Sequence, residues 1–408
     1  MLNATPVNAD LIGIEGSARH LDTPALVLDL PAFRRNVRRM RDRIAGTAVT
    51  LRPHAKTHKC AQIAKIQIVA GAQGICTAKL AEAEALAREG LSDILVTSPI
   101  VGMRPIRRLM ALNARLDRLA VVADDADAIA ALTWAAEASG RRLTVFLDLD
   151  VGTHRTGALP AEAAALAGLI AEAPFLRFGG VQAYGGHLQH LHGAETRSSE
   201  TRAMWRVVAD VVDHLRENGI PCPTVTGGGT GTHEDDLSAG VLTELQGGSY
   251  IFMDREYADL EDAPAFEQAL FVYTRVISRR QKAFVTTDAG IKAFATDGPL
   301  PTLATGPFEG ARYFLQGDEY GGIVLGAGKN GAGGARSDAE ILSAIRAITA
   351  MNMDDTVPAP ARSVGLGTLV ACAVPHCDPT VNLYDHIHVI EDNCLMAIWP
   401  VIARGASQ

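Results

Sequence analysis

Residues 143–173 read LTVFLDLDVGTHRTGALPAEAAALAGLIAEA and contain one complete strand-and-helix unit. The first part, Leu143–Asp148, is a short apolar run of the kind that forms a strand in a parallel sheet. After a loop that contains glycine, the alanine-rich stretch Ala161–Ala173 has the length and composition of a helix. The unit places Asp148 and Asp150 at the carboxyl end of its strand, where α/β enzymes carry their polar chemistry.

The same alternation repeats from Leu51 to Gln246. Eight strands are predicted: Leu51–Lys56, Gly74–Thr77, Asp93–Thr97, Leu119–Ala123, Leu143–Asp148, Phe178–Tyr184, Thr224–Thr226 and Leu242–Gln246. Eight such units suggest a closed (β/α)8 TIM-like barrel, although an open doubly wound sheet has the same periodicity. The barrel is favoured because polar residues follow several different strands and so indicate one central site.

The pattern changes after about Phe266, and the change predicts a second domain. Apolar runs such as Ala269–Ile277 and Gly367–Val374 follow one another without helices of matching length. We therefore predict the barrel over residues 24–267 and a β-rich domain formed by residues 1–23 and 268–408. An insertion near 326–363, which starts with GAGKNGAGG, interrupts the second domain.

Composition and charge argue against several classes of partner. The 408 residues carry a formal net charge of −8, and no face concentrates Lys and Arg as nucleic-acid binding requires. The basic stretch Arg34–Arg43 has apolar residues at helical spacing, which predicts an amphipathic helix with a solvated arginine face. No apolar run reaches the roughly 18 residues of a membrane-spanning helix. The six cysteines form no CxxC pair and the first residues lack a leader pattern, so we expect a cytoplasmic protein with reduced thiols.

The octet Arg52–Lys59 (RPHAKTHK) is the most informative segment for chemistry. A lysine at the end of the first barrel strand can project into the barrel mouth, where desolvation lowers its pKa and makes it a nucleophile toward an aldehyde. Lys56 is that candidate. An exposed basic turn explains the octet equally well.

Two glycine runs follow the last two predicted strands: GGGTGT at 227–232 and GGS at 247–249. Glycines let backbone N–H groups approach an anion, and barrels commonly bind phosphate at the loops after strands seven and eight. Tight turns have the same composition. A lysine on strand one together with a phosphate site on strands seven and eight suggests pyridoxal phosphate, which needs both.

A third segment, 150–157 (DVGTHRTG), offers Arg155 on a glycine-flanked loop after strand five. An arginine that donates to the pyridine nitrogen would keep this nitrogen unprotonated and weaken the ring as an electron sink. A surface loop arginine is at least as common. Tyr184, at the end of the sixth predicted strand, is a further candidate for cofactor binding.

Near the carboxyl end, His376 and Asp378 lie two residues apart, which would put them on the same side of an extended segment. Such a nitrogen–oxygen pair suits a divalent metal (Mg, Mn or Zn) with open positions for water and substrate. A simple hydrogen-bonded pair of His and Asp is the more common explanation.

Together these segments resemble the D-threonine aldolase group. The resemblance rests on PHAKTHK, DVGxxRxG, GGGTG, ELQxGSYxFMDxxY and HCDPTxN and runs along nearly the whole chain. This group includes 3-hydroxy-D-aspartate aldolase and is related to metal-dependent D-serine dehydratase. The resemblance implies an alanine-racemase-like, fold-type III barrel with a C-terminal β domain, and a homodimer with its active site near the subunit interface.

The resemblance also implies residue roles. Lys56 would hold pyridoxal phosphate as the Schiff-base lysine, and Arg155 would face the pyridine nitrogen. The other implied contacts are Thr230, Gly248 and Ser249 for the phosphate region, Tyr257 for the cofactor, and His376 and Asp378 for the metal. One departure is Ala78, which stands where some of these aldolases have glutamine, so a side-chain contact to the cofactor is either missing or supplied by Thr77.

Three functions follow as hypotheses. The first is retro-aldol cleavage of a β-hydroxy-D-amino acid to glycine and an aldehyde or oxo acid, with His187 or His190 as the base for the hydroxyl proton. The second is a dehydratase in which Lys56 removes the α-proton; Asp378 stands where such dehydratases have cysteine, which favours the aldolase. The third is a non-catalytic carrier of pyridoxal phosphate, which would have no use for His376 and Asp378.

Overall fold

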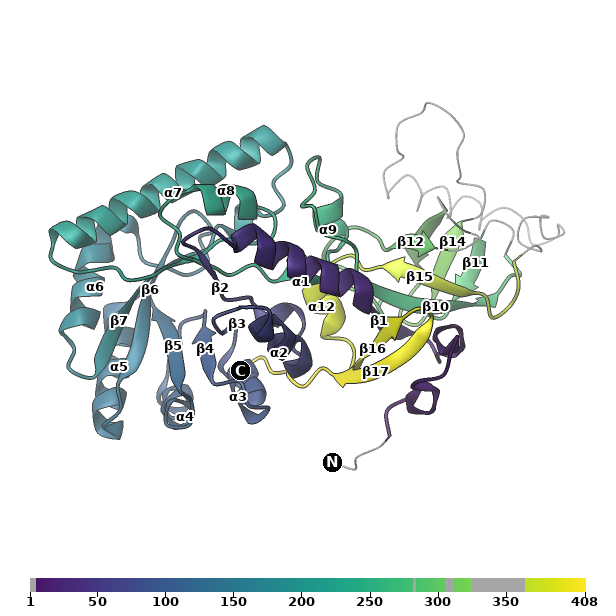
Figure 1. Cartoon of the computed structure of the whole chain (residues 1–408), viewed down its shortest axis with the longest axis horizontal. Coiled ribbons are helices and arrows are strands. Elements are labelled where there is room, and N and C mark those ends of the chain that lie inside the picture. The colour runs from purple at the N-terminus through teal and green to yellow at the C-terminus, as the bar shows by residue number, and fades with distance from the viewer. Residues whose placement is uncertain (1–4, 282–283, 306–307, 309–310, 325–363) are drawn as a thin grey trace. The chain divides into compact units, whose positions relative to one another are not determined.

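The computed structural model describes residues 5–281, 284–305, 308, 311–324 and 364–408 (Figure 1). The predicted insertion near 326–363 lies outside the described residues. Contacts divide the chain into two compact units. The barrel unit consists of residues 35–251, 259–266 and 402–408, and the β unit consists of residues 1–34, 252–258 and 267–401.

The barrel unit is built on an eight-stranded parallel sheet with the order β2-β9-β8-β7-β6-β5-β4-β3. Its strands are β2 (Thr50–Leu51), β3 (Ile75–Thr77), β4 (Asp93–Val96), β5 (Arg118–Ala123), β6 (Leu143–Leu149), β7 (Leu176–Ala183), β8 (Val225–Gly227) and β9 (Glu244–Leu245). The two edges of this sheet meet: a parallel bridge joins His54 to Cys76, and the Cys76 N–H donates to the Pro53 oxygen at 2.9 Å. The strands therefore close into a barrel, which confirms the predicted fold class.

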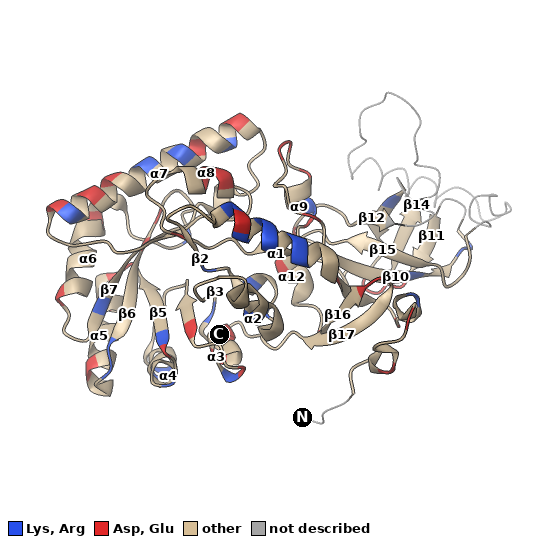
Figure 2. Ribbon diagram, in the orientation of Figure 1, with Lys and Arg blue, Asp and Glu red and all other residues tan. Residues whose placement is uncertain are grey.

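Helices cover the outer side of the barrel strands (Figure 1). They are α1 (Leu30–Ile44), α2 (Ala61–Val69), α3 (Leu80–Arg88), α4 (Met103–Asn113), α5 (Ala126–Ser139), α6 (Ala163–Glu172), α7 (Ala194–Glu217) and α8 (His233–Ser238). Local sequence signals set their ends: Asp125 caps α5 by accepting the N–H groups of Asp127 and Ala128, and Gly140, with φ 64°, terminates it. The amphipathic helix predicted from Arg34–Arg43 is α1. Figure 2 shows Lys and Arg residues in blue along its ribbon.

The β unit contains a nine-stranded sheet with the order β11-β14-β13-β12-β15-β10-β1-β16-β17. An additional pairing of β11 with β10 closes six of these strands into an antiparallel barrel. The strands are β1 (Ala25–Asp29), β10 (Leu270–Ser278), β11 (Phe284–Thr287), β12 (Thr302–Thr305), β13 (Arg312–Leu315), β14 (Gly321–Val324), β15 (Leu369–Ala373), β16 (His386–Glu391) and β17 (Cys394–Pro400). The described part of the unit also contains the short helices α9 (Arg255–Ala258) and α12 (Cys377–Val381).

The division differs from the expected boundary at residue 24. Strand β1 pairs antiparallel with β10 and parallel with β16, and so belongs to the β unit. A five-residue apolar strand fits the interior of either sheet, and only its partner strands decide between them. In the described part of the chain, none of the helices has the length and apolar character to cross a membrane.

Candidate active site

Lys56 lies in a 3₁₀ turn, η3 (Ala55–Thr57), after the first barrel strand. The predicted strand Leu51–Lys56 is wrong after its first residue, because β2 ends at Leu51. Pro53, two residues after Leu51, lacks the N–H group that would donate a hydrogen bond to a neighbouring strand. His54 holds the turn: its Nδ1 accepts the Lys56 N–H at 3.3 Å, and its Nε2 lies 3.0 Å from the Thr97 hydroxyl. Lys56 is half-buried in this turn.

The neighbouring Lys59 has a structural role instead. Its Nζ lies 3.2 Å from a carboxylate oxygen of Glu82, and both side chains are nearly buried. The other Glu82 oxygen accepts the N–H groups of Ala78 and Lys79 at the start of α3. Lys59 therefore neutralises a carboxylate that caps a helix.

The two glycine runs meet beside the Lys56 turn. A methyl group at Gly248 would lie 2.5 Å from the Thr57 hydroxyl and 3.0 Å from the His54 carbonyl oxygen, so only glycine allows this approach. The Thr230 hydroxyl accepts the Tyr250 N–H at 3.1 Å, which ties the two runs together. Ser249 is buried at the start of the 3₁₀ turn η6 (Ser249–Ile251). The structure thus brings four predicted residues, Lys56, Thr230, Gly248 and Ser249, into one corner of the barrel.

Two hydroxyl groups near this corner indicate that it accepts a polar ligand. Among the described residues, the hydroxyls of Thr57, next to Lys56, and of Thr77, at the end of β3, are buried and have no hydrogen-bond partner. An unsatisfied buried hydroxyl costs about 1–3 kcal/mol. A ligand rich in oxygen would satisfy both, and the Gly248 cradle leaves backbone exposed to it. These residues fit pyridoxal phosphate.

The glycine loop at 227–232 is held by residues that the sequence did not single out. Asp236 accepts hydrogen bonds from the Gly229 N–H (3.0 Å), the Thr232 hydroxyl (2.8 Å) and the Trp205 indole (2.8 Å). Burial raises the pKa of Asp236 to about 7, and these three donors oppose that rise. Gln189 accepts the Gly231 N–H at 3.0 Å. Asp236 and Gln189 therefore hold the glycine loop in place by accepting hydrogen bonds from its backbone N–H groups.

We expect Gly248→Ala to lower the affinity for pyridoxal phosphate by about tenfold or more, because the new methyl group displaces the Lys56 turn. Equilibrium binding of the cofactor, followed by its absorbance, measures the effect. Gly168→Ala is the control, since its methyl group would meet only ordinary contacts at 3.9 Å within α6. Equal affinity of the two variants for pyridoxal phosphate would contradict the assignment of Gly248 to the cofactor site.

A second group of predicted residues lies over strands β6 and β7. The Arg155 guanidinium carbon is 5.8 Å from the centre of the Tyr184 ring, a cation–π distance. The Thr153 hydroxyl donates to the Tyr184 carbonyl at 2.8 Å and lies 3.4 Å from Nδ1 of His187. His187 is exposed in the turn η5 (Gly186–Leu188), and His190 is half-buried just beyond it. The structure places Arg155, Tyr184 and His187 together.

A chain of hydrogen bonds connects this group with the Lys56 turn. Gln182 donates to the Thr97 carbonyl (3.2 Å) and to Asp148 (2.8 Å), and the Thr156 hydroxyl donates to the other Asp148 oxygen (2.8 Å). Thr97 in turn contacts His54. The sequence placed Asp148 at the right end of its strand but gave no signal for Gln182, whose importance arises from contacts across the barrel.

Burial raises the pKa of Asp148 from 3.8 to about 6, although its hydrogen bonds with Gln182 and Thr156 oppose the rise. Between these values the folded protein keeps a proton that the unfolded chain releases, so this group lowers stability as pH rises from about 4 to about 6. We expect Asp148→Asn to remove this loss, which amounts to at most about 3 kcal/mol. Urea unfolding at about pH 4 and about pH 7 measures it. A wild-type-like pH dependence in the variant would contradict the assignment.

The remaining predicted residues, Tyr257, His376 and Asp378, lie in the β unit. The expected extended segment is wrong: His376 is the N-cap of α12, and Asp378 lies in its first turn. The N-cap arrangement is stabilised by Asp254, which accepts the Cys377 N–H at 2.9 Å and the Tyr257 N–H at 3.2 Å. Asp254 thereby links α12 to α9, which carries Tyr257.

Carboxylates surround the His376 imidazole. Its Nδ1 lies 2.9 Å from Asp297 and 3.8 Å from Glu256. Burial lowers the pKa of His376, but the nearby carboxylates of Asp378, Glu256 and Asp297 outweigh that effect and raise it. Within the described residues, no group of three or more His, Cys, Asp or Glu is arranged around a common metal position. The pair His376 and Asp378 has the nitrogen–oxygen donor chemistry that a divalent cation accepts.

Comparison with known proteins agrees with this fold and site. The family model for the alanine racemase N-terminal domain matches residues 28–256, and a serine dehydratase domain model matches residues 269–390. A D-threonine aldolase from Arthrobacter sp is 36% identical over 95% of this chain and 94% of its own. A 3-hydroxy-D-aspartate aldolase from Paracoccus denitrificans is 33% identical over 94% and 92%. The crystal structure of D-threonine aldolase from Filomicrobium marinum matches with a TM-score of 0.83 at 34% identity, over 96% of this chain and 98% of that one.

More distant relatives include a D-threo-3-hydroxyaspartate dehydratase from Delftia sp., which is 32% identical over 68% of this chain and 73% of its own. The barrel and the matching family model define the class of the chain as alanine-racemase-like, and this class implies pyridoxal phosphate as the cofactor. Within that class the chain belongs to the D-threonine aldolase family of lyases. The family resemblance inferred from the sequence motifs is thus confirmed.

Proposed function

We propose that this protein cleaves β-hydroxy-D-amino acids of the D-threonine or 3-hydroxy-D-aspartate type by a retro-aldol reaction that needs pyridoxal phosphate and a divalent metal. The products would be glycine and an aldehyde or an oxo acid. The observation that carries the proposal is the contact between the Lys56 turn and Gly248, in a chain whose similar relatives include two kinds of aldolase. The reaction and its substrates are inferred from those relatives.

The barrel residues would hold the cofactor as follows. Lys56 would attach it covalently, and Thr230, Gly248 and Ser249 would bind its phosphate. Arg155 would donate to the pyridine nitrogen, and Tyr184 would contact the cofactor. For Tyr257, which belongs to the β unit, the family resemblance alone implies a contact with the cofactor. Pyridoxal phosphate, when bound, supplies an electron sink for the bond that breaks at the α-carbon.

The chain's own groups would manage the proton of the β-hydroxyl. His187 or His190 would accept it, since an imidazole can act as a general base. His376 and Asp378 would hold the divalent cation (Mg, Mn or Zn), which supplies a Lewis acid for the hydroxyl oxygen. This role fits the excess of carboxylates around His376, because a cation relieves their mutual repulsion.

A dehydratase is the second candidate, and the Delftia relative is the observation in its favour. Lys56 would then remove the α-proton and hydroxide would depart. Asp378 argues for the aldolase, because a hard carboxylate suits Mg or Mn, which acidify a hydroxyl that stays with its fragment. We further propose that the enzyme works in the cytoplasm as a homodimer.

One product assay tests these alternatives. The metal-supplemented holoenzyme is incubated with D-threonine, D-threo-3-hydroxyaspartate and D-serine, and the products are identified. We expect glycine with acetaldehyde from D-threonine, or glycine with glyoxylate from the hydroxyaspartate. Ammonia with an oxo acid as the only products would show a dehydratase and overturn the proposal.

A further inference from the structure

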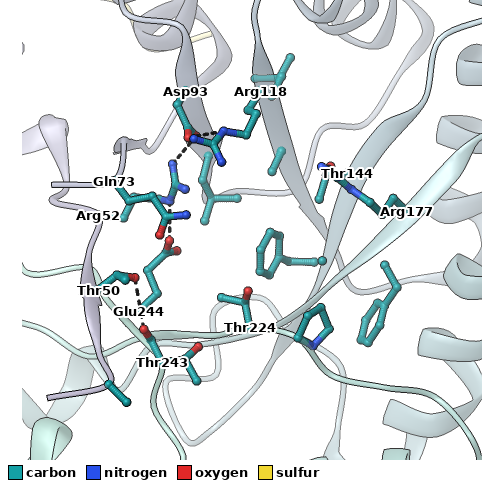
Figure 3. A pocket seen from close by; sticks show the side chains of 18 residues that line it. Thr50, Arg52, Gln73, Asp93, Arg118, Thr144, Arg177, Thr224, Thr243 and Glu244 are labelled. Atoms are coloured by element: carbon teal, nitrogen blue, oxygen red, sulfur yellow. Dashed lines mark hydrogen bonds and ion pairs between the residues drawn. The ribbon is translucent and has the colours of Figure 1, made fainter. Parts of the chain in front are cut away.

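The barrel unit has a second cavity at the end opposite to the Lys56 turn. It has a volume of about 600 Å³, and many of its lining residues lie at or just before the amino-terminal ends of the barrel strands (Figure 3). Thr50, Asp93 and Arg118, for example, begin strands β2, β4 and β5. The size falls within the range of about 300–1,000 Å³ that is typical of small-molecule sites.

One wall of this cavity is a fixed network of paired charges. Arg52 donates to Glu244 at 2.8 Å and to Asp93 at 2.6 Å, and Arg118 lies 2.8 Å from the other Asp93 oxygen. Figure 3 shows these side chains on one side of the cavity. Burial opposes the charge of Arg52, but the carboxylates of Glu244 and Asp93 outweigh it and raise the Arg52 pKa. The absence of a side chain at Gly74 leaves room for the Arg52 guanidinium, because a methyl group there would collide with it.

Arg177 is the arginine of the lining whose positive charge the network does not neutralise. The lining contains Arg52, Arg118 and Arg177 against Asp93 and Glu244, which gives three positive and two negative groups. Within the described residues Arg177 forms no ion pair. Its exposed guanidinium donates to the Thr144 hydroxyl at 2.6 and 3.1 Å, across the register of β6 and β7. Since arginine has five N–H donors, others are left for an anion.

The cavity is also partly apolar. Leu95, Phe146, Phe178 and Pro223 contribute to its lining. Phe146 packs with Leu95 in a core cluster, and Gly179 gives its ring room, since a methyl group there would lie 2.5 Å from the ring. The cavity therefore combines an aromatic surface with an unpaired guanidinium.

We propose that this cavity is a second ligand site, which binds a small organic carboxylate with an aromatic or other apolar body, and that Arg177 binds the carboxylate. The apolar part lies against Phe146 and its neighbours. The paired network of Arg52, Asp93 and Glu244 forms a rigid polar wall that needs no ligand. The site is separate from the candidate active site, because the two lie at opposite ends of the barrel strands.

Binding of benzoate to the holoenzyme tests the proposal by isothermal titration calorimetry. We expect one saturable site per chain, with acetate and benzylamine binding at least about tenfold more weakly, because acetate lacks the apolar body and benzylamine the negative charge. Arg177→Gln should weaken benzoate binding by about tenfold or more through loss of a charge-assisted hydrogen bond. The side chain is exposed, so the variant should fold.

Arg142→Gln is the matched control, since Arg142 is an exposed arginine next to β6 that does not line the cavity. It should bind benzoate as the wild type does. Equal binding of benzoate by the wild type and Arg177→Gln would overturn the proposal, as benzoate would then occupy another site. Binding of acetate or benzylamine as tightly as benzoate would overturn it as well.

Discussion

Lys56→Ala is expected to lose the visible absorbance of bound pyridoxal phosphate and to lose activity by at least about 10³-fold. The physical reason is that the neighbouring amine cannot replace it: Lys59, three residues away, forms an ion pair with Glu82. Spectrophotometry of the purified protein and a product assay measure both losses. Borohydride reduction of the wild type, followed by mass spectrometry of fragments, should fix the cofactor on Lys56.

Lys59→Gln is the matched control for that experiment. It breaks a nearly buried ion pair and should therefore lower the free energy of unfolding, while the cofactor absorbance stays. Reduction that fixes the cofactor on Lys59 would move the assignment by three residues and contradict the one made above.

Asp378→Ala, or exhaustive chelation of the wild type, is expected to abolish activity while the cofactor stays bound. The reason is that the metal is assigned to the β unit, with His376 and Asp378, and the cofactor lysine to the barrel unit. Activity and cofactor absorbance are measured on the same sample. Asp392→Asn, which removes an exposed carboxylate from the β unit, controls for net charge and should remain active. Full activity after chelation would refute the metal role.

Asp378→Cys extends this experiment. A thiolate prefers Zn, whereas a carboxylate suits Mg or Mn, so the variant should shift its metal preference toward Zn and lose retro-aldol turnover. A variant that keeps its metal preference and its rate would make Asp378 a structural partner of α12. The choice between aldolase and dehydratase would then depend on other residues.

The barrel strands were largely predictable, because each is a short buried apolar run between helical stretches, as in β6. The predicted first strand was too long for a local reason: the run Leu51–Lys56 contains Pro53, and the chain leaves the sheet there to form η3. The sequence nevertheless predicts the position of Lys56 at the carboxyl end of the barrel. A residue in the turn directly after a strand lies at the same edge of the sheet as the last residue of that strand.

The residues that support the site were not predictable. Asp236 and Gln189 act through hydrogen bonds to Gly229 and Gly231, and Gln189 lies about forty residues from that loop. Nothing in a local pattern distinguishes such a glutamine from a solvated one, because its partners are set by the closed barrel. The membership of β1 in the β unit could not be predicted for the same reason, since its partners β10 and β16 lie far along the chain.

The position of β1 also has a consequence for biosynthesis. Its partners β10 and β16 begin at Leu270 and His386, so an apolar strand made among the first thirty residues waits until residue 270 for its first partner and until residue 386 for its second. The barrel strands are all complete by Leu245 and can pair earlier. The first strand therefore stays unpaired on the ribosome after the barrel strands are complete, and an unpaired strand edge can associate with other nascent chains. Fragments that end before β16 should aggregate for this reason, even when their barrel strands are intact.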